Sequence, residues 1–153
     1  AETMTLEQWR KVVDVDLTAQ FLMARAAGQR MIKAGKGGAI ISTASMSGHI
    51  VNVPQPQCAY NASKAGLIHL TKSLATEWAK YNIRVNSISP GYMATPLSID
   101  VPRERMENWF FSAPMKRMGL PEELQGAVVY LASEAASYTT GADIIIDGGY
   151  SCV

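Results

Sequence analysis

Short β-branched runs alternate with long helical segments along this chain, and this alternation limits the folds that it can adopt. The expected strands, each bounded by Gly, Ser or Pro, are residues 39–43, 82–89 and 142–146. Apolar residues at helical spacing predict helices over residues 6–33, 58–81 and 121–133. A capping-box pattern at Thr5 and Gln8 indicates that the first helix begins near Leu6. Strands separated by helices are typical of a parallel sheet with helices on both faces, so we expect an α/β fold.

Composition narrows the class of protein. The chain has 153 residues, of which 48% are hydrophobic and 18% charged, and this suits one compact domain over residues 1–153. No run approaches the about 18 apolar residues of a membrane span. The polar N-terminus lacks the apolar core of a signal peptide. A formal charge of +1 lacks the basic excess of nucleic-acid and membrane-surface binders, so we expect neither partner.

The cysteines and histidines argue against disulfides and metal ions. Cys58 and Cys152 are too few for a disulfide framework, and two reduced thiols are typical of a cytoplasmic protein, which is the location that we expect. The chain has two histidines, and neither HExxH nor CxxC occurs. We therefore expect no metal site.

The segment with the most chemical information is Tyr60-Asn61-Ala62-Ser63-Lys64, within the second expected helix. Residues four apart lie on the same helix face, so the phenol of Tyr60 and the ammonium of Lys64 should be neighbours. A free phenol, with a pKa of about 10, is a poor base at neutral pH, and a nearby ammonium favours the charged phenolate. Such a tyrosine can exchange a proton with an alcohol or carbonyl oxygen. By itself the spacing is weak evidence, because it also occurs by chance in many helices.

The ends of two expected strands bring further polar groups to one edge of the sheet. Ser45 follows the first strand, and Pro90 and Gly91 follow the second. Ligands bind at the carboxyl ends of parallel strands, so these ends and the first turn of the second helix should line one crevice. There, the hydroxyl of Ser45 can donate a hydrogen bond to a substrate oxygen.

Together these segments resemble the short-chain dehydrogenases/reductases, and the likeness covers essentially the whole chain. Four motifs occur in the order typical of the family: Ser45-Met46-Ser47-Gly48, Tyr60-Asn61-Ala62-Ser63-Lys64, residues 84–91, and Thr140-Gly141 with Asp147-Gly148-Gly149. Pro54-Gln55 and the ending at residues 147–152 resemble the branch of yeast and fungal carbonyl reductases, sorbose reductases and arabinitol or mannitol dehydrogenases. The resemblance implies a doubly wound, Rossmann-like parallel sheet. It also implies an NAD(P)-dependent oxidoreductase that interconverts a ketone and a secondary alcohol, with a ketose and a polyol as the expected pair.

The resemblance assigns a role to individual side chains. Tyr60 would be the general acid/base at the reacting oxygen, and Lys64 would favour its phenolate and bind the nicotinamide ribose. Ser45 would orient the substrate oxygen, with Ser47 as its rival because the Ser-to-Tyr spacing varies in the family. The nicotinamide would be lined by Pro90, Gly91, Met93 and Thr95.

Substrate lid, cofactor and assembly also follow from the resemblance. The segment from Thr95 to about Phe111, with a helix expected near residues 103–111, would be the lid, and Trp109 and Phe110 would form its apolar wall. The cofactor would be NADP or NAD, with NADP slightly favoured. The other partners would be a small carbonyl or alcohol substrate and sister subunits, because the two long helices would pack against another copy in a homodimer or homotetramer.

Two features depart from the family pattern. Asp16 stands where the family often has an Asn that helps a water relay from the lysine, and an ionised Asp accepts hydrogen bonds but donates none. Asp16 is therefore either a catalytic part of that relay or a buried polar residue. The Gly-rich strand–turn–helix that cradles the pyrophosphate has no match, since the glycines at 35–38 end a helix and precede a strand. We therefore expect this chain to be the C-terminal catalytic part of the fold, without about 100 residues of the N-terminal Gly-rich half.

Two other interpretations stand beside the reductase. A serine hydrolase would use Ser45, an aspartate and either His49 or His69. It is disfavoured because Gly-x-Ser-x-Gly is absent and both histidines come early in the chain. Alternatively, the chain is a truncated or partly ordered protein that acts only as a catalytically incompetent oligomerisation fragment.

Overall fold

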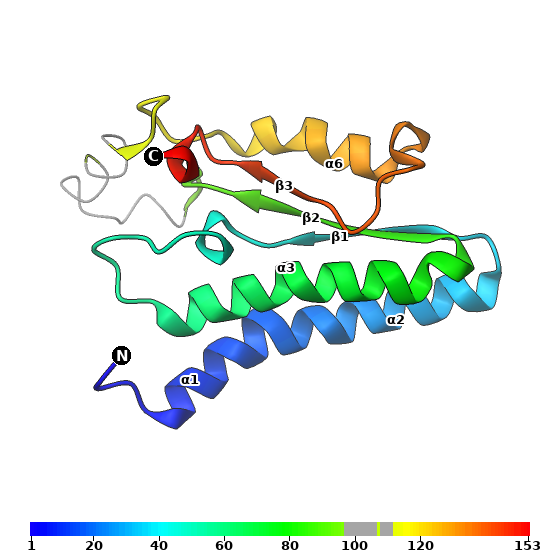
Figure 1. The fold of residues 1–153 in the computed structure, drawn as a ribbon, viewed down its shortest axis with the longest axis horizontal. Helices are drawn as coiled ribbons and strands as arrows, with labels where there is room; N and C mark the ends of the chain where they lie inside the picture. Colours follow the sequence, from blue (N-terminus) through cyan, green and yellow to red (C-terminus); the bar gives the residue numbers. More distant parts are fainter. Residues whose placement is uncertain (97–106, 108–111) are drawn as a thin grey trace.

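The computed structural model describes residues 1–96, 107 and 112–153, and it contains a parallel sheet between two helical layers. In the described residues the strand order is β1-β2-β3, with both neighbouring pairs parallel. Helices α2 and α3 cover one face of the sheet and α6 covers the other (Figure 1). The strands are β1 (Gly38–Thr43), β2 (Ile83–Pro90) and β3 (Asp143–Ile146), and the helices are α1 (Leu6–Val13), α2 (Ala19–Ala34), α3 (Cys58–Trp78) and α6 (Gln125–Ala132). The expected α/β fold is confirmed.

A π-helical turn interrupts the first long helix. The predicted capping box is present: Thr5 Oγ accepts from the Gln8 N–H, and the Gln8 side chain accepts from the Thr5 N–H. The helix continues through α1, changes to a π-helix over Asp14–Thr18, and resumes as α2. It ends at Gly35, whose positive φ of 67° suits glycine. The sequence therefore predicted the length of this helix but not the π-turn within it.

The apolar core lies between the sheet and the α2–α3 layer. Ile83 and Val85 of β2 pack there against Leu74 of α3 and Ala24 of α2. Neighbouring residues of a strand point to opposite faces, and Arg84 accordingly points toward the end of α6. Its guanidinium donates to carbonyl oxygens of residues 131 and 133 at 2.7 and 3.1 Å. The central strand is thus held by apolar packing on one face and by helix capping on the other.

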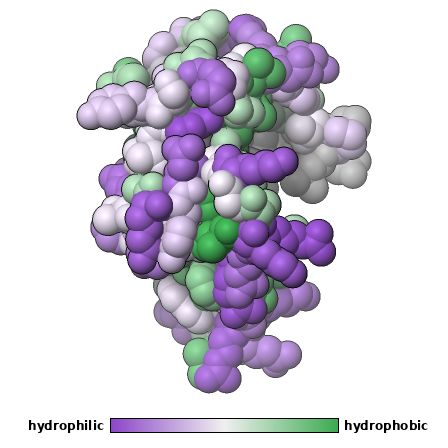
Figure 2. Space-filling model, turned by 90° about the vertical axis from the view of Figure 1, so that its right-hand side faces the viewer, coloured by the Kyte–Doolittle hydropathy of each residue, from purple (hydrophilic) through white to green (hydrophobic). Residues whose placement is uncertain are grey.

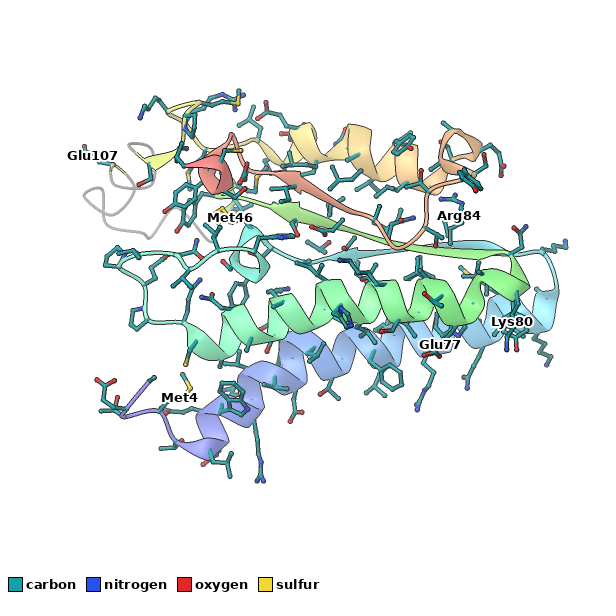
Figure 3. All side chains as sticks on the ribbon, in the orientation of Figure 1. Met4, Met46, Glu77, Lys80, Arg84 and Glu107 are labelled. Atoms are coloured by element: carbon teal, nitrogen blue, oxygen red, sulfur yellow. The ribbon has the colours of Figure 1, made fainter. Side chains whose placement is uncertain are left out.

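The two ends of the sheet differ in character. At the carboxyl ends of the strands lie a short 3-10 turn, η2 (Met46–Gly48), and the C-terminal residues (Figure 1). Figure 3 labels Met46 at this end and Arg84 at the opposite one. The opposite end presents mainly hydrophilic side chains around a limited hydrophobic area (Figure 2). None of the described helices is both long and apolar enough to cross a membrane.

Candidate active site

Lys64 stands at the centre of a cluster built from three separate segments. Its ammonium lies 5.4 Å from the ring centre of Tyr60, one turn earlier on α3. It donates to the Thr43 carbonyl at 3.2 Å and pairs with Asp16 Oδ1 at 3.3 Å. Lys64 is only 8% exposed. An ammonium has three N–H donors. Within the described part of the chain, one is hydrogen-bonded to the Thr43 carbonyl, and Asp16 adds a contact of opposite charge.

Asp16 reaches Lys64 from the π-helical turn. The turn lies against α3, where an added Cβ on Gly66 would be 3.1 Å from the Leu17 side chain. π-helical turns are frequent at functional sites. The structure brings the carboxylate of Asp16 and the ammonium of Lys64 together as an ion pair, so Asp16 has a specific partner in the site.

Ser45 begins the turn that follows β1. Its Oγ accepts a hydrogen bond from the Ser47 backbone N–H at 3.1 Å. A hydroxyl that accepts in this way still has its own hydrogen to donate. Ser45 is 8% exposed and follows Ala44, whose N–H donates to Ile88 of β2 at 2.8 Å.

Ser47 belongs to a network of amide side chains in the same loop. Its hydroxyl donates to Asn52 Oδ1 at 2.6 Å and accepts from Gln57 Nε2 at 3.2 Å. Asn52 Nδ2 also donates to the Tyr92 hydroxyl at 3.2 Å, and that hydroxyl donates to Gln55 Oε1 at 2.6 Å. The segments that follow β1 and β2 are therefore joined by side-chain hydrogen bonds. This network was not predicted from the sequence, although the Asn and Gln residues of the loop were a signal for it.

The four residues assigned to the nicotinamide lie on the segment that leaves β2 at this edge. Pro90 ends β2, and the Gly91 N–H donates to the Ile146 carbonyl at 2.9 Å. A Cβ at Gly91 would lie 2.7 Å from Asp147 Cα, so close packing requires glycine there. Met93 forms an isolated parallel β-bridge with residue 119. The Thr95 N–H donates to the Met93 carbonyl at 3.0 Å. Trp109 and Phe110, together with most of the expected lid, lie outside the described residues.

His49, Asp143 and Ser89 form a cluster that the sequence did not predict. His49 Nε2 lies 2.7 Å from Asp143 Oδ2 and 3.5 Å from Ser89 Oγ. A hydrolase triad needs the carboxylate on one ring nitrogen and the serine on the other, whereas here both partners meet Nε2. Ser89 is also fully buried. This cluster therefore does not have the geometry of a serine hydrolase.

Comparisons with known proteins agree on one family. A family model described as Enoyl-(Acyl carrier protein) reductase matches residues 1–151. The solved structure of a short-chain type dehydrogenase/reductase from Mycobacterium marinum superimposes with a TM-score of 0.95 at 50% identity, covering 99% of this chain and 59% of that one. The chain belongs to the short-chain dehydrogenase/reductase family.

Among short-chain dehydrogenases/reductases, the chain is similar to sugar and polyol enzymes of fungi. It is 56% identical over 146 residues to the "Probable NADP-dependent mannitol dehydrogenase" of Yarrowia lipolytica, covering 95% of this chain and 52% of that protein. It is 51% identical over 146 residues to a sorbose reductase of Candida albicans, with the same coverage of 95% and 52%. The chain thus spans about half the length of the relatives that it matches. The resemblance to this fungal branch is confirmed.

Proposed function

We propose that the full-length protein is an NADP-dependent oxidoreductase that interconverts a ketose and a polyol. The observation that carries the proposal is the ammonium of Lys64, 5.4 Å from the Tyr60 ring and buried beside Asp16 and the end of β1. The names of the similar fungal proteins support the substrate class and NADP. Because the chain spans about half of these relatives, the activity is proposed for the whole protein.

The residues present fit a nicotinamide nucleotide. The ammonium of Lys64 would donate to the ribose hydroxyls, and the backbone at Met93 and Thr95, on the segment after β2, would hold the carboxamide. Pro90 and Gly91, at the end of β2, would give this site an apolar edge. When bound, the nicotinamide supplies or accepts the hydride at the carbonyl carbon.

The protein's own part in the reaction is to move a proton and to hold the oxygen. In reduction, the Tyr60 hydroxyl gives its proton to the carbonyl oxygen, and in oxidation the phenolate removes it. The nearby Lys64 ammonium stabilises that phenolate. Ser45 donates its hydroxyl hydrogen to the same oxygen. Ser47 is the poorer candidate for this role, because its hydrogen is already donated to Asn52.

Asp16 acts on this chemistry through Lys64. Its carboxylate contacts the ammonium at 3.3 Å and keeps the long lysine side chain directed toward Tyr60 and the end of β1. We assign it as a positioning residue rather than as a group that touches the substrate.

Substitution of the tyrosine tests the proposal. Full-length Tyr60→Phe, assayed with NADPH and a panel of ketoses, should lose about 10²- to 10⁴-fold in kcat, the usual contribution of a general acid. Tyr81→Phe is a matched control, because Tyr81 also has a neighbouring lysine, Lys80, 5.1 Å from its ring centre. Full activity in Tyr60→Phe would overturn the assignment of the general acid.

We also propose a homo-oligomer in the cytoplasm. Both described cysteines are free thiols, which supports a reducing compartment. Large apolar side chains are exposed along the helix formed by α1, the π-turn and α2, and such surfaces typically mark contacts between subunits. They are Leu6, Trp9, Val15, Phe21, Leu22 and Met23.

A further inference from the structure

A buried carboxylate beneath the Ser45 turn has no part in the chemistry proposed so far. Asp143 opens β3, and its side chain is 7% exposed. Its Oδ1 accepts from Ser87 Oγ at 2.5 Å and its Oδ2 contacts His49 Nε2 at 2.7 Å. Burying a carboxylate is costly unless its oxygens receive hydrogen bonds, so both donors are structurally significant.

The contact with His49 has a defined direction. An ionised carboxylate only accepts, so Nε2 carries the hydrogen and donates it to Asp143. The bond joins residues 94 positions apart. β2 lies between β1 and β3 in the sheet, so the bond reaches from the turn after β1, across β2, to β3.

The same turn carries Ser45. Ser45 is the N-cap of η2 and His49 is its C-cap, and two backbone bonds close the turn, from the N–H of Gly48 to Ser45 O and from the N–H of His49 to Met46 O. On its other side, the turn lies directly on α3, where an added Cβ at Gly48 would be 2.9 Å from the carbonyl carbon of Lys64. The turn is therefore held against the helix by Gly48 and against the sheet by His49.

We propose that His49 and Asp143 form a tether that positions the Ser45 hydroxyl for the reaction. The proposal rests on the proposed function, since it assumes that Ser45 holds the reacting oxygen. Without the tether, the turn keeps its contact with α3 but loses its attachment to β3, and the direction of the Ser45 O–H becomes less well defined. Binding of the nicotinamide should not change, because Lys64 and the segment after β2 keep their own contacts.

Substitutions of His49 in the full-length enzyme test the tether. His49→Ala should lower kcat by about 10- to 100-fold, the scale expected when a catalytic group is misplaced by about 1 Å, with KM for NADPH unchanged. His49→Gln should recover most of the loss, because its amide N–H can donate to Asp143. His69→Ala, which removes an exposed histidine of α3, is the matched control and should behave as the wild type.

His49→Phe keeps the ring volume without the donor and serves the same purpose if His49→Ala does not fold. Loss in His49→Phe with recovery in His49→Gln supports the tether. Wild-type kcat in a folded variant that lacks the donor overturns it, as does failure of His49→Gln to recover activity.

A double substitution distinguishes failure of the tether from failure of the proposed function. If His49 acts through Ser45, then adding His49→Ala to Ser45→Ala should reduce kcat less than twofold further, whereas independent effects would multiply. Multiplication would overturn the tether while leaving the oxidoreductase assignment intact. Full activity in Ser45→Ala alone would overturn the role of Ser45 and the tether with it, and Tyr60→Phe would still report separately on the oxidoreductase.

Discussion

At the scale of the residue, the ammonium of Lys64 shows which contacts a sequence can predict. Its neighbour Tyr60 follows from helical periodicity alone, because side chains four residues apart share a face. Its pairing with Asp16 does not, because that contact depends on a π-turn and on how two helices pack. The sequence left Asp16 either as a catalytic part of a water relay or as a buried polar residue, and it did not predict the ion pair with Lys64 that the structure contains.

Asp16 substitutions measure what this ion pair contributes. Asp16→Ala leaves a buried ammonium with the Thr43 carbonyl as its remaining described acceptor, so the free energy of unfolding should fall by about 1–3 kcal/mol. Asp16→Asn keeps an acceptor oxygen and should lose less. Urea denaturation of the variants provides the comparison. Equal stability of all three proteins would mean that the contact is not formed in solution.

At the scale of the element, the sequence predicted most helices and strands to within a few residues, because capping patterns, glycines and β-branched runs mark their ends. The expected helix at 121–133 is a 3-10 turn, η4 (Pro121–Leu124), followed by α6. No helix or strand was predicted for the segment that contains the turn η2. It forms because Ser45 caps it and because Gly48 permits it to lie on α3. Neither close packing nor a single short turn leaves a periodic pattern in the sequence.

Two glycines give a matched test of that packing. Gly48→Ala would place a Cβ 2.6 Å from the Ile68 side chain and 2.9 Å from the backbone of Lys64, so stability should fall by about 1–3 kcal/mol. An added Cβ at Gly126 in α6 meets no atom within 4 Å, and Gly126→Ala should change stability by less than about 1 kcal/mol, in the stabilising direction. Thermal unfolding of both variants distinguishes a local clash from a general intolerance of alanine.

The segment leading into η4 carries a pH-dependent ion pair. Arg117 hydrogen-bonds both carboxylate oxygens of Glu123 at 2.7 Å, and this holds the pKa of Glu123 at about 2, below its ordinary 4.5. A carboxyl with a lowered pKa in the folded state stabilises it above pH 4.5 and loses that contribution as the pH falls toward 2. The melting temperature of the wild type should therefore fall more than that of Glu123→Gln between pH 5 and 2. Parallel curves would show that the pair does not form.

At the scale of the whole molecule, the parallel arrangement of the strands explains why distant motifs meet. Ser45, Tyr60 and Pro90 were expected at one edge because parallel strands end together. The structure gathers the turn after β1, the first turns of α3 and the end of β2 there. The tether from His49 to Asp143 was not predictable, because it joins residues 94 apart through side chains that no motif connects.

The exposed apolar side chains of α1 and α2 lead to a prediction about the oligomeric state of the protein. Met23 is 71% exposed, although large apolar side chains usually lie in the interior or in interfaces. If these side chains contact another subunit, Met23→Glu in the full-length protein buries a charge there and should lower the mass measured by light scattering from a dimer or tetramer toward a monomer. Gln29→Glu adds the same charge at an exposed polar position of the same helix and should leave the mass unchanged. A Met23→Glu protein with the wild-type mass would show that subunits meet elsewhere, and equal dissociation by both variants would point to general repulsion rather than to this surface.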